Sequence, residues 1–153
     1  MNIEFIKAKL CDIVNMQALI APEIESGIIL PRTDDEVATN IRSYTLALKE
    51  GELVGFCALH IHAPSLAEIR SLIIKEEFRG KKIGENLINT CLEEARGLGL
   101  QKVLSLTYKQ SFFERLGFVE IPKESLPEHK IWADCIKCKH FPVCNEVSLI
   151  KNL

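Results

Sequence analysis

The spacing of apolar residues divides the chain into short segments with a strand period and longer segments with a helical period. Alternating or short apolar runs predict strands at residues 3–8, 44–49, 53–62, 67–74, 102–107, 118–121 and 147–150. Apolar residues three or four positions apart predict helices at residues 10–21, 34–43, 83–95 and 110–116. The resulting order, β-α-α-β-β-β-α-β-α-β-β, predicts an α/β (α+β) fold with a mixed sheet and helices on both faces.

Local signals support several of these boundaries. The segment Thr33-Asp34-Asp35-Glu36 is a capping-box pattern, which predicts a helix start. Glu50-Gly51-Glu52 predicts the turn of a hairpin. Residues 122–146 read as a long polar connection within a single domain that spans residues 1–153.

Composition excludes several classes of protein. Acidic and basic residues nearly balance, with a formal net charge of −2, so nothing indicates a nucleic-acid partner. No apolar run approaches the ~20 residues that a membrane helix needs. The N-terminal segment carries Glu4 early and lacks the apolar stretch of a signal peptide. We therefore expect a cytoplasmic protein without a membrane partner.

One segment predicts an anion site. Residues 72–74 end a strand, a basic glycine-containing turn follows at residues 79–82, and a helix then begins near Ile83. Backbone N–H groups at such a helix N-terminus favour an anion, and a diphosphate would fit. The spacing is neither that of a P-loop nor that of a dinucleotide fingerprint. A tight turn with solvated lysines is the alternative.

The same segment resembles the phosphate loop of the GCN5-related N-acetyltransferases (GNAT), which has the form (Q/R)-x-x-G-x-(G/A). Arg79 fills the first place and Gly84 the last, whereas Lys82 stands where a glycine is usual. We expect this departure to matter little if residue 82 has ordinary helical dihedrals. A second match, Phe112 to Phe118, resembles the family's YEKxGF segment. The resemblance implies a mostly antiparallel sheet of about seven strands, splayed at the fourth.

A narrower resemblance is to the acetyltransferase domain of N-acetylglutamate synthases. It rests on residues 19–32, residues 54–59 and Leu126-Pro127. It implies transfer of an acetyl group from acetyl-CoA to the α-amine of an amino acid, most simply L-glutamate, in the first step of arginine biosynthesis. The chain would then be a minimal form without the kinase-like domain of the usual bacterial enzyme.

The resemblance also implies roles for individual residues. Glu68 matches the place of a glutamate base. The usual acidic tyrosine is replaced by Phe113, so Tyr108 becomes the candidate acid, unless backbone N–H groups stabilise the thiolate. The residues expected to bind the cosubstrate are Leu72, Ile73, Ile74, Arg79, Gly80, Lys81, Lys82, Ile83 and Gly84.

An amino-acid acceptor brings carboxylates, for which the planar guanidinium of arginine is a fitting partner. Arg32, in the matched stretch, is the first candidate. Arg70 would share a face with Glu68 if the strand is regular there, and Lys130 is the third candidate. Each could instead be a solvated surface charge.

The six cysteines form two groups. Cys11, Cys57 and Cys91 lie singly in apolar patterns and are expected to be small buried hydrophobes. The other three cluster near histidines and could form a structural zinc site. The expected ligands are Cys135, Cys138, His140 and Cys144, with His129 as a substitute for His140. Reduced thiols or a labile disulfide are the alternatives.

Two other functions stay open from the sequence. The acceptor could be another small amine or a protein N-terminus. A non-catalytic acyl-CoA sensor would keep residues 79–84 but would lack a working base. The sequence also leaves open whether the chain forms a homodimer.

Overall fold

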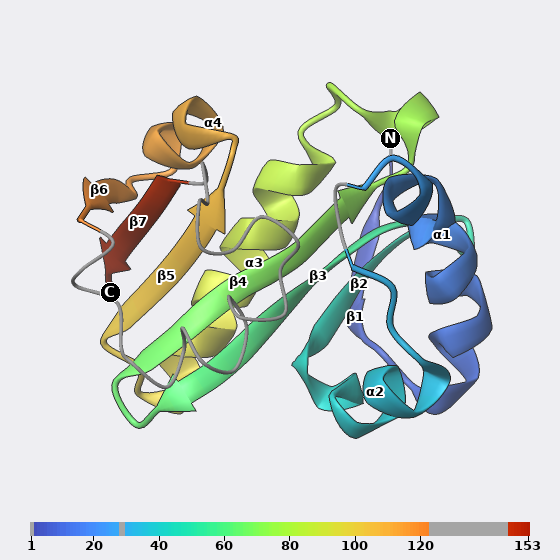
Figure 1. The fold of residues 1–153 in the computed structure, drawn as a ribbon, viewed down its shortest axis with the longest axis horizontal. Coiled ribbons are helices and arrows are strands. Elements are labelled where there is room, and N and C mark those ends of the chain that lie inside the picture. The colour runs from blue at the N-terminus through green and yellow to red at the C-terminus, as the bar shows by residue number, and fades with distance from the viewer. Residues whose placement is uncertain (1, 28–29, 123–146) are drawn as a thin grey trace.

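A single seven-stranded sheet forms the centre of the computed structural model, which describes residues 2–27, 30–122 and 147–153 (Figure 1). The strand order is β1-β2-β3-β4-β5-β7-β6. The strands are β1 Glu4–Lys7, β2 Tyr44–Lys49, β3 Glu52–Ala63, β4 Leu66–Ile74, β5 Lys102–Thr107, β6 Val119–Ile121 and β7 Val147–Asn152. Strands β4 and β5 are parallel, and the other neighbours are antiparallel. The predicted mixed sheet is confirmed.

Helices cover both faces of this sheet, as the sequence predicts. They are α1 Ile13–Glu25, α2 Asp34–Thr39, α3 Ile83–Leu98 and α4 Gln110–Arg115. Short 3-10 turns lie at Leu10–Asp12, Ile41–Ser43 and Glu76–Phe78. In Figure 1, α3 lies behind the sheet, and α1 and α2 lie on the other side over β1–β3.

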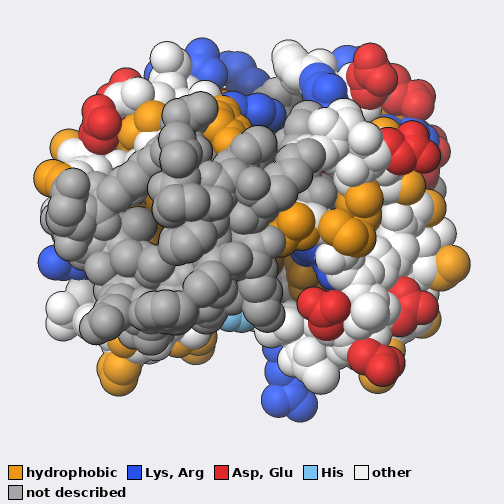
Figure 2. All heavy atoms as spheres, in the orientation of Figure 1, with side chains coloured by type: hydrophobic (Ala, Val, Ile, Leu, Met, Phe, Trp, Pro, Cys, Tyr) orange, Lys and Arg blue, Asp and Glu red, His pale blue; other side chains and the backbone are white. Residues whose placement is uncertain are grey.

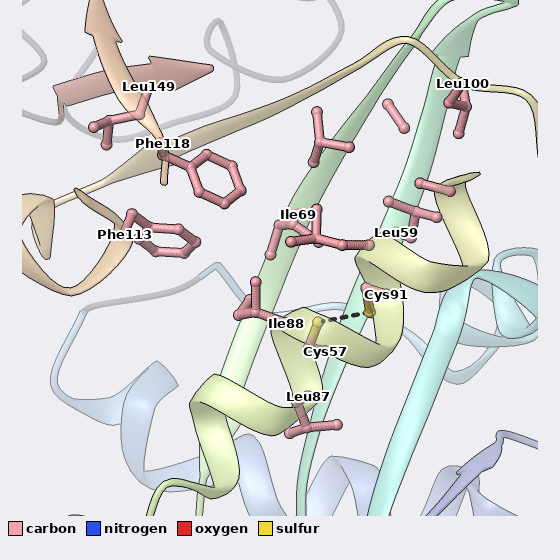
Figure 3. Close-up of a cluster of buried hydrophobic side chains, with 14 of the residues drawn as sticks. Cys57, Leu59, Ile69, Leu87, Ile88, Cys91, Leu100, Phe113, Phe118 and Leu149 are labelled. Atoms are coloured by element: carbon pink, nitrogen blue, oxygen red, sulfur yellow. Dashed lines mark hydrogen bonds between the residues drawn. The ribbon is translucent and has the colours of Figure 1, made fainter. Parts of the chain in front are cut away.

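Each face has its own apolar core. The α3 face is built by residues such as Leu87, Ile88 and Cys91 of the helix against Cys57 and Ile69 of the sheet (Figure 3). The opposite face buries Met16 and Ile20 of α1 and Val37 of α2 against Tyr44, Leu46, Phe56, Ala58 and Ile73. These two layers fix the positions of β3 and β4 relative to α1 and α3.

Two expectations from the sequence are wrong at the first helix. The helix was expected to end at residue 21, but α1 continues through Pro22 to Glu25. Its packed residues hold it in place, since Met16 and Ile20 are buried and Ile24 packs on the same core. Cys11 is exposed rather than buried, because it lies in a 3-10 turn that buries no residue.

Candidate functional site

Strands β4 and β5 separate partway along their length and form a fork. Their parallel pairing runs from Leu66 opposite Lys102 to Ile69 opposite Ser105. Strand β4 then continues to Ile74 and β5 to Thr107, and Figure 1 shows the two arms diverging. An extended ligand could pair with the backbone of β4 in this fork as an added strand would.

An irregularity in β4 marks the place where the fork opens. Between β3 and β4, Ala58 pairs with Arg70 but Phe56 pairs with Ile73, so β4 contains one additional residue. Ser71 lies there with φ of 55°, which is rare for a residue with a side chain. Such a bulge changes which face the following side chains occupy.

The packing of β4 agrees with this change of face. Before the bulge, Ile69 packs on the α3 core. After it, Leu72 packs on that same core, and Ile73 packs on the α1 and α2 core. The strand is regular from Glu68 to Arg70, so these two side chains share a face, as expected.

Arg32 reaches the bulge from the segment before α2. Its Nη1 donates hydrogen bonds to Oγ of Ser71 at 2.9 Å and to the hydroxyl of Tyr44 at 3.1 Å. The next residue, Thr33, caps α2 and accepts a hydrogen bond from the amide of Glu36 at 3.1 Å, as the capping box predicts. The capped start of α2 thus fixes the backbone next to Arg32. Tyr44 of β2 and Ser71 at the bulge of β4 hold its guanidinium at the fork.

A buried acidic group lies at the base of the same fork. Glu68 pairs with Leu104 of β5, one position before the last pair of the parallel register. Its Oε1 lies 2.8 Å from Nε2 of His62, and the side chains of His62 and Glu68 are 6% and 4% exposed. The sequence analysis missed His62. The hairpin register, which places His60 opposite Glu68, is the signal that could have found it.

The turn before α3 has the geometry of an anion site. Lys82, the N-cap residue, has φ of 65° and makes no side-chain capping bond. The amide of Asn86 bonds to the carbonyl of Lys82 at 3.1 Å. The N–H groups of residues 83–85 are those that the first turn of an α-helix leaves without an intrahelical partner. They point out of the helix N-terminus, as a bound phosphate would require.

Residue 82 does not have the helical dihedrals under which we expected the departure from the family pattern to matter little. Its left-handed conformation is the one that glycine adopts without strain, and the family pattern has glycine at this place. The turn from the 3-10 segment into α3 requires this backbone conformation, so Lys82 adopts it at a cost.

Two other residues of the turn have clear structural roles. Arg79 donates from Nε to the carbonyl of Ile74 at 3.2 Å and from Nη2 to Oε1 of Glu23 at 2.8 Å, which ties the turn to β4 and α1. A Cβ on Gly84 would lie 3.6 Å from Phe112 and 3.7 Å from Ile74. Gly84 therefore faces the packed side of α3, and an alanine would fit there.

Basic side chains gather above this region. Figure 2 shows Lys and Arg side chains at the upper edge of the molecule near α4, and both basic and acidic side chains farther along that edge, near the turn between β4 and α3. The basic side chains near α4 would attract a polyanionic ligand.

The place of the usual family tyrosine and the candidate acid Tyr108 have different environments. Phe113 is 3% exposed and stacks edge-on with Phe112 and Phe118, each at 5.2 Å between ring centroids. It is a core residue. Tyr108 is 53% exposed and follows Thr107, at the end of the β5 arm of the fork.

Several predicted residues cannot be placed. Lys130, Cys135, Cys138, His140 and Cys144 lie outside the described residues, and the substrate and zinc roles expected of them stay predictions. Within the described part of the chain, no cluster of three or more His, Cys, Asp or Glu side chains could hold a metal ion. Over the same residues, no helix is long and apolar enough to cross a membrane.

Comparisons with known proteins agree with this geometry. The model of the acetyltransferase (GNAT) family matches residues 12–118. An uncharacterized N-acetyltransferase of Chlorobaculum tepidum is 36% identical over 146 residues, which cover 95% of this chain and 94% of that protein. An amino-acid acetyltransferase of Neisseria meningitidis serogroup A is 30% identical over 119 residues, which cover 76% of this chain.

A solved structure extends the likeness to the whole chain. N-acetylglutamate synthase from Neisseria gonorrhoeae, in complex with coenzyme A and N-acetyl-glutamate, superimposes with a TM-score of 0.88 at 26% sequence identity. That match covers 100% of this chain and 35% of the synthase. The chain likewise spans 27% of the length of the meningococcal amino-acid acetyltransferase.

Proposed function

The chain belongs to the acetyltransferase (GNAT) family, and from this premise we propose that it transfers the acetyl group of acetyl-CoA to the α-amine of L-glutamate. The product would be N-acetyl-L-glutamate, the first intermediate of arginine biosynthesis. The enzyme is an acyltransferase, and acetyl-CoA is its cosubstrate. Glutamate as the acceptor is the new element of the proposal.

The observation that carries this proposal is the position of Arg32. Its guanidinium is held at the bulge of β4 by Ser71 and Tyr44, beside the fork. An arginine in this place can bind a carboxylate of the acceptor while the amine points toward the acetyl group. Arg70, on the same face as Glu68, is the candidate for the second carboxylate.

The cosubstrate would lie along the fork and across the start of α3. We assign its pyrophosphate to the backbone N–H groups of residues 80–84, with Lys81 and Lys82 adding positive charge. The backbone of Leu72, Ile73 and Ile74 is the edge against which its extended arm would pair. The reacting carbonyl would then lie near the bulge.

Proton transfer in this proposal begins at Glu68. A free amino acid carries a protonated amine near neutral pH, since the α-amino pKa is about 7.7–8.0 even in peptides. Glu68 takes one proton from this ammonium, directly or through a water molecule. The amine nitrogen, which still carries two protons, then attacks the thioester carbonyl carbon, so a C–N bond forms and the C–S bond breaks. The nitrogen releases one of these two protons to the solvent as the amide forms. The leaving thiolate takes a proton from Tyr108 or is stabilised by backbone N–H groups.

Steady-state kinetics of thiol release test the proposal. Truncation of a bidentate partner costs about 2–5 kcal/mol of binding, so Arg32→Ala should raise the KM for glutamate roughly 30-fold or more. The KM for acetyl-CoA should stay the same. Arg42→Ala, an exposed arginine in the turn before β2, is the matched control.

Two results would count against the proposal. Glutamate no better than leucine as an acceptor would refute the choice of substrate. An unchanged glutamate KM in Arg32→Ala would refute the role of Arg32. Tight acetyl-CoA binding without turnover toward any amine would instead support an acyl-CoA sensor.

A further inference from the structure

We propose that His62 is a positioning residue for the acetyl-transfer reaction and holds the carboxylate of Glu68 in the orientation that a base requires. The inference rests on the proposed function, in which Glu68 deprotonates the acceptor amine. The contact that carries it is 2.8 Å between Nε2 of His62 and Oε1 of Glu68. Both side chains are almost completely buried.

The β3–β4 hairpin creates this contact through a second irregularity. Ile61 pairs with Ala67 and Ala63 pairs with Leu66, so His62 is the additional residue of a bulge in β3. A bulge redirects the side chain at which it occurs, and bulges are common beside active sites. Here the imidazole is directed diagonally across the hairpin onto the carboxylate of Glu68 rather than toward solvent.

The chemistry of the pair follows from its burial. A buried carboxylate is unfavourable in its charged form unless donors stabilise it. An N–H at Nε2 of His62 donates to Oε1 of Glu68 and supplies one such hydrogen bond. This contact therefore fixes the orientation of the carboxylate.

Two neighbouring groups share the surroundings of this pair. The ring of His60 lies 5.4 Å from that of His62, and Arg70 is two residues beyond Glu68 on the same face of β4. A test of His62 must therefore separate its effect from that of an adjacent histidine.

The test compares three variants of His62 with His60→Gln and Glu68→Gln. Turnover is measured by thiol release, with acetyl-CoA and the best amino-acid acceptor as substrates. His62→Leu removes the donor, and His62→Asn keeps an amide that is too short to reach Oε1. His62→Gln places an amide nitrogen near the position of Nε2. His60→Gln is the matched control, and thermal unfolding checks that each variant is folded.

A positioning role predicts a specific pattern. His62→Leu and His62→Asn should lower kcat about 10- to 100-fold, a fraction of what a general base contributes. The KM for acetyl-CoA should not change, because His62 contacts the base and not the cosubstrate. His62→Gln should recover most of kcat, and His60→Gln should behave like the wild type.

Failure of the inference and failure of the proposed function give different results. If Glu68→Gln abolishes turnover while His62→Leu keeps the wild-type kcat, the inference is overturned and Glu68 remains the base. If Glu68→Gln is as active as the wild type, the assignment of the base fails, and the role of His62 fails with it. Should His62→Leu not fold, equal kcat values for His62→Asn and His62→Gln overturn the inference on their own.

Discussion

Arg32 donates a hydrogen bond to Oγ of Ser71 over 2.9 Å, and Ser71 is the residue at which β4 changes face. The bulge that opens the fork thus also holds the proposed carboxylate-binding group. Arg32 and Ser71, which are 39 positions apart in the sequence, thus lie in one site.

Removal of the Ser71 hydroxyl should loosen Arg32 without damage to the fold. A hydrogen bond from a charged donor contributes about 1.5–3 kcal/mol, so Ser71→Ala and Ser71→Gly should each raise the glutamate KM roughly 10-fold or more. Ser71→Gly also relieves the positive φ, which separates the loss of the hydroxyl from backbone strain. Wild-type glutamate KM in both variants would mean that the contact does not orient Arg32.

The left-handed backbone of Lys82 predicts opposite effects of two substitutions. A left-handed residue with a side chain costs about 1–2 kcal/mol, most for β-branched types. Lys82→Val should therefore lower the melting temperature, whereas Lys82→Gly should not. If the turn binds phosphate through N–H groups, Lys82→Gly should change the acetyl-CoA KM no more than Lys81→Ala, which removes the same charge. Loss of acetyl-CoA binding in Lys82→Gly alone would assign the contact to the lysine side chain.

Gly55 permits the close approach of β3 and β4 beside the fork. A Cβ at this position would lie 2.9 Å from the carbonyl oxygen of Ile73 and 2.8 Å from Cδ1 of Ile74. Gly55→Ala should therefore destabilise the protein by about 1–3 kcal/mol, measured by denaturant unfolding. Gly97→Ala is the control, because a Cβ there meets nothing within 4 Å. Because residue 97 lies inside α3, Gly97→Ala should raise the free energy of unfolding by about 0.5–1 kcal/mol. Equal changes in the free energy of unfolding for Gly55→Ala and Gly97→Ala would contradict the packing described for Gly55.

The buried thiols of Cys57 and Cys91 predict a dependence of stability on alkaline pH. Their sulfur atoms lie 3.3 Å apart between β3 and α3 (Figure 3). The hydrogen bond with Cys91 and burial raise the pKa of Cys57 well above its ordinary value of 9.0. The same hydrogen bond, with help from Thr45, lowers the pKa of Cys91.

The sign of the effect follows from the proton count. Above pH 9.0 the unfolded chain loses the Cys57 proton but the folded protein keeps it, so unfolding releases a proton and rising pH favours unfolding. The free energy of unfolding should therefore fall more steeply with pH in this range for the wild type than for the double variant Cys57→Ala/Cys91→Ala, which removes both coupled thiols. Chemical unfolding at several pH values measures this slope, and Cys11→Ala, at an exposed thiol, should leave it unchanged. A slope of the double variant equal to that of the wild type would contradict the prediction.

The sequence predicts the elements of this fold well because their signals are local. The helical period of α3, the capping box at Thr33 and the hairpin at Gly51 each lie within a few residues. The order of elements along the chain follows from the same signals.

The site itself depends on pairing between distant segments. The bulges at Ser71 and His62 exist only in the register of β3 against β4, which no local pattern specifies. The bond from Arg79 to Glu23 and the exposed position of Cys11 depend on how α1 packs. For the same reason, Glu68 and Arg32 could be named as candidates, but their partners could not.

The most direct test of glutamate acetylation is to identify the product. The purified protein is incubated with acetyl-CoA and an equimolar mixture of the twenty amino acids, and the N-acetylated products are measured by mass spectrometry. Our proposal predicts N-acetylglutamate as the main product with the wild type, and its loss with Glu68→Gln. A different N-acetylated amino acid as the main product, or none, would contradict it.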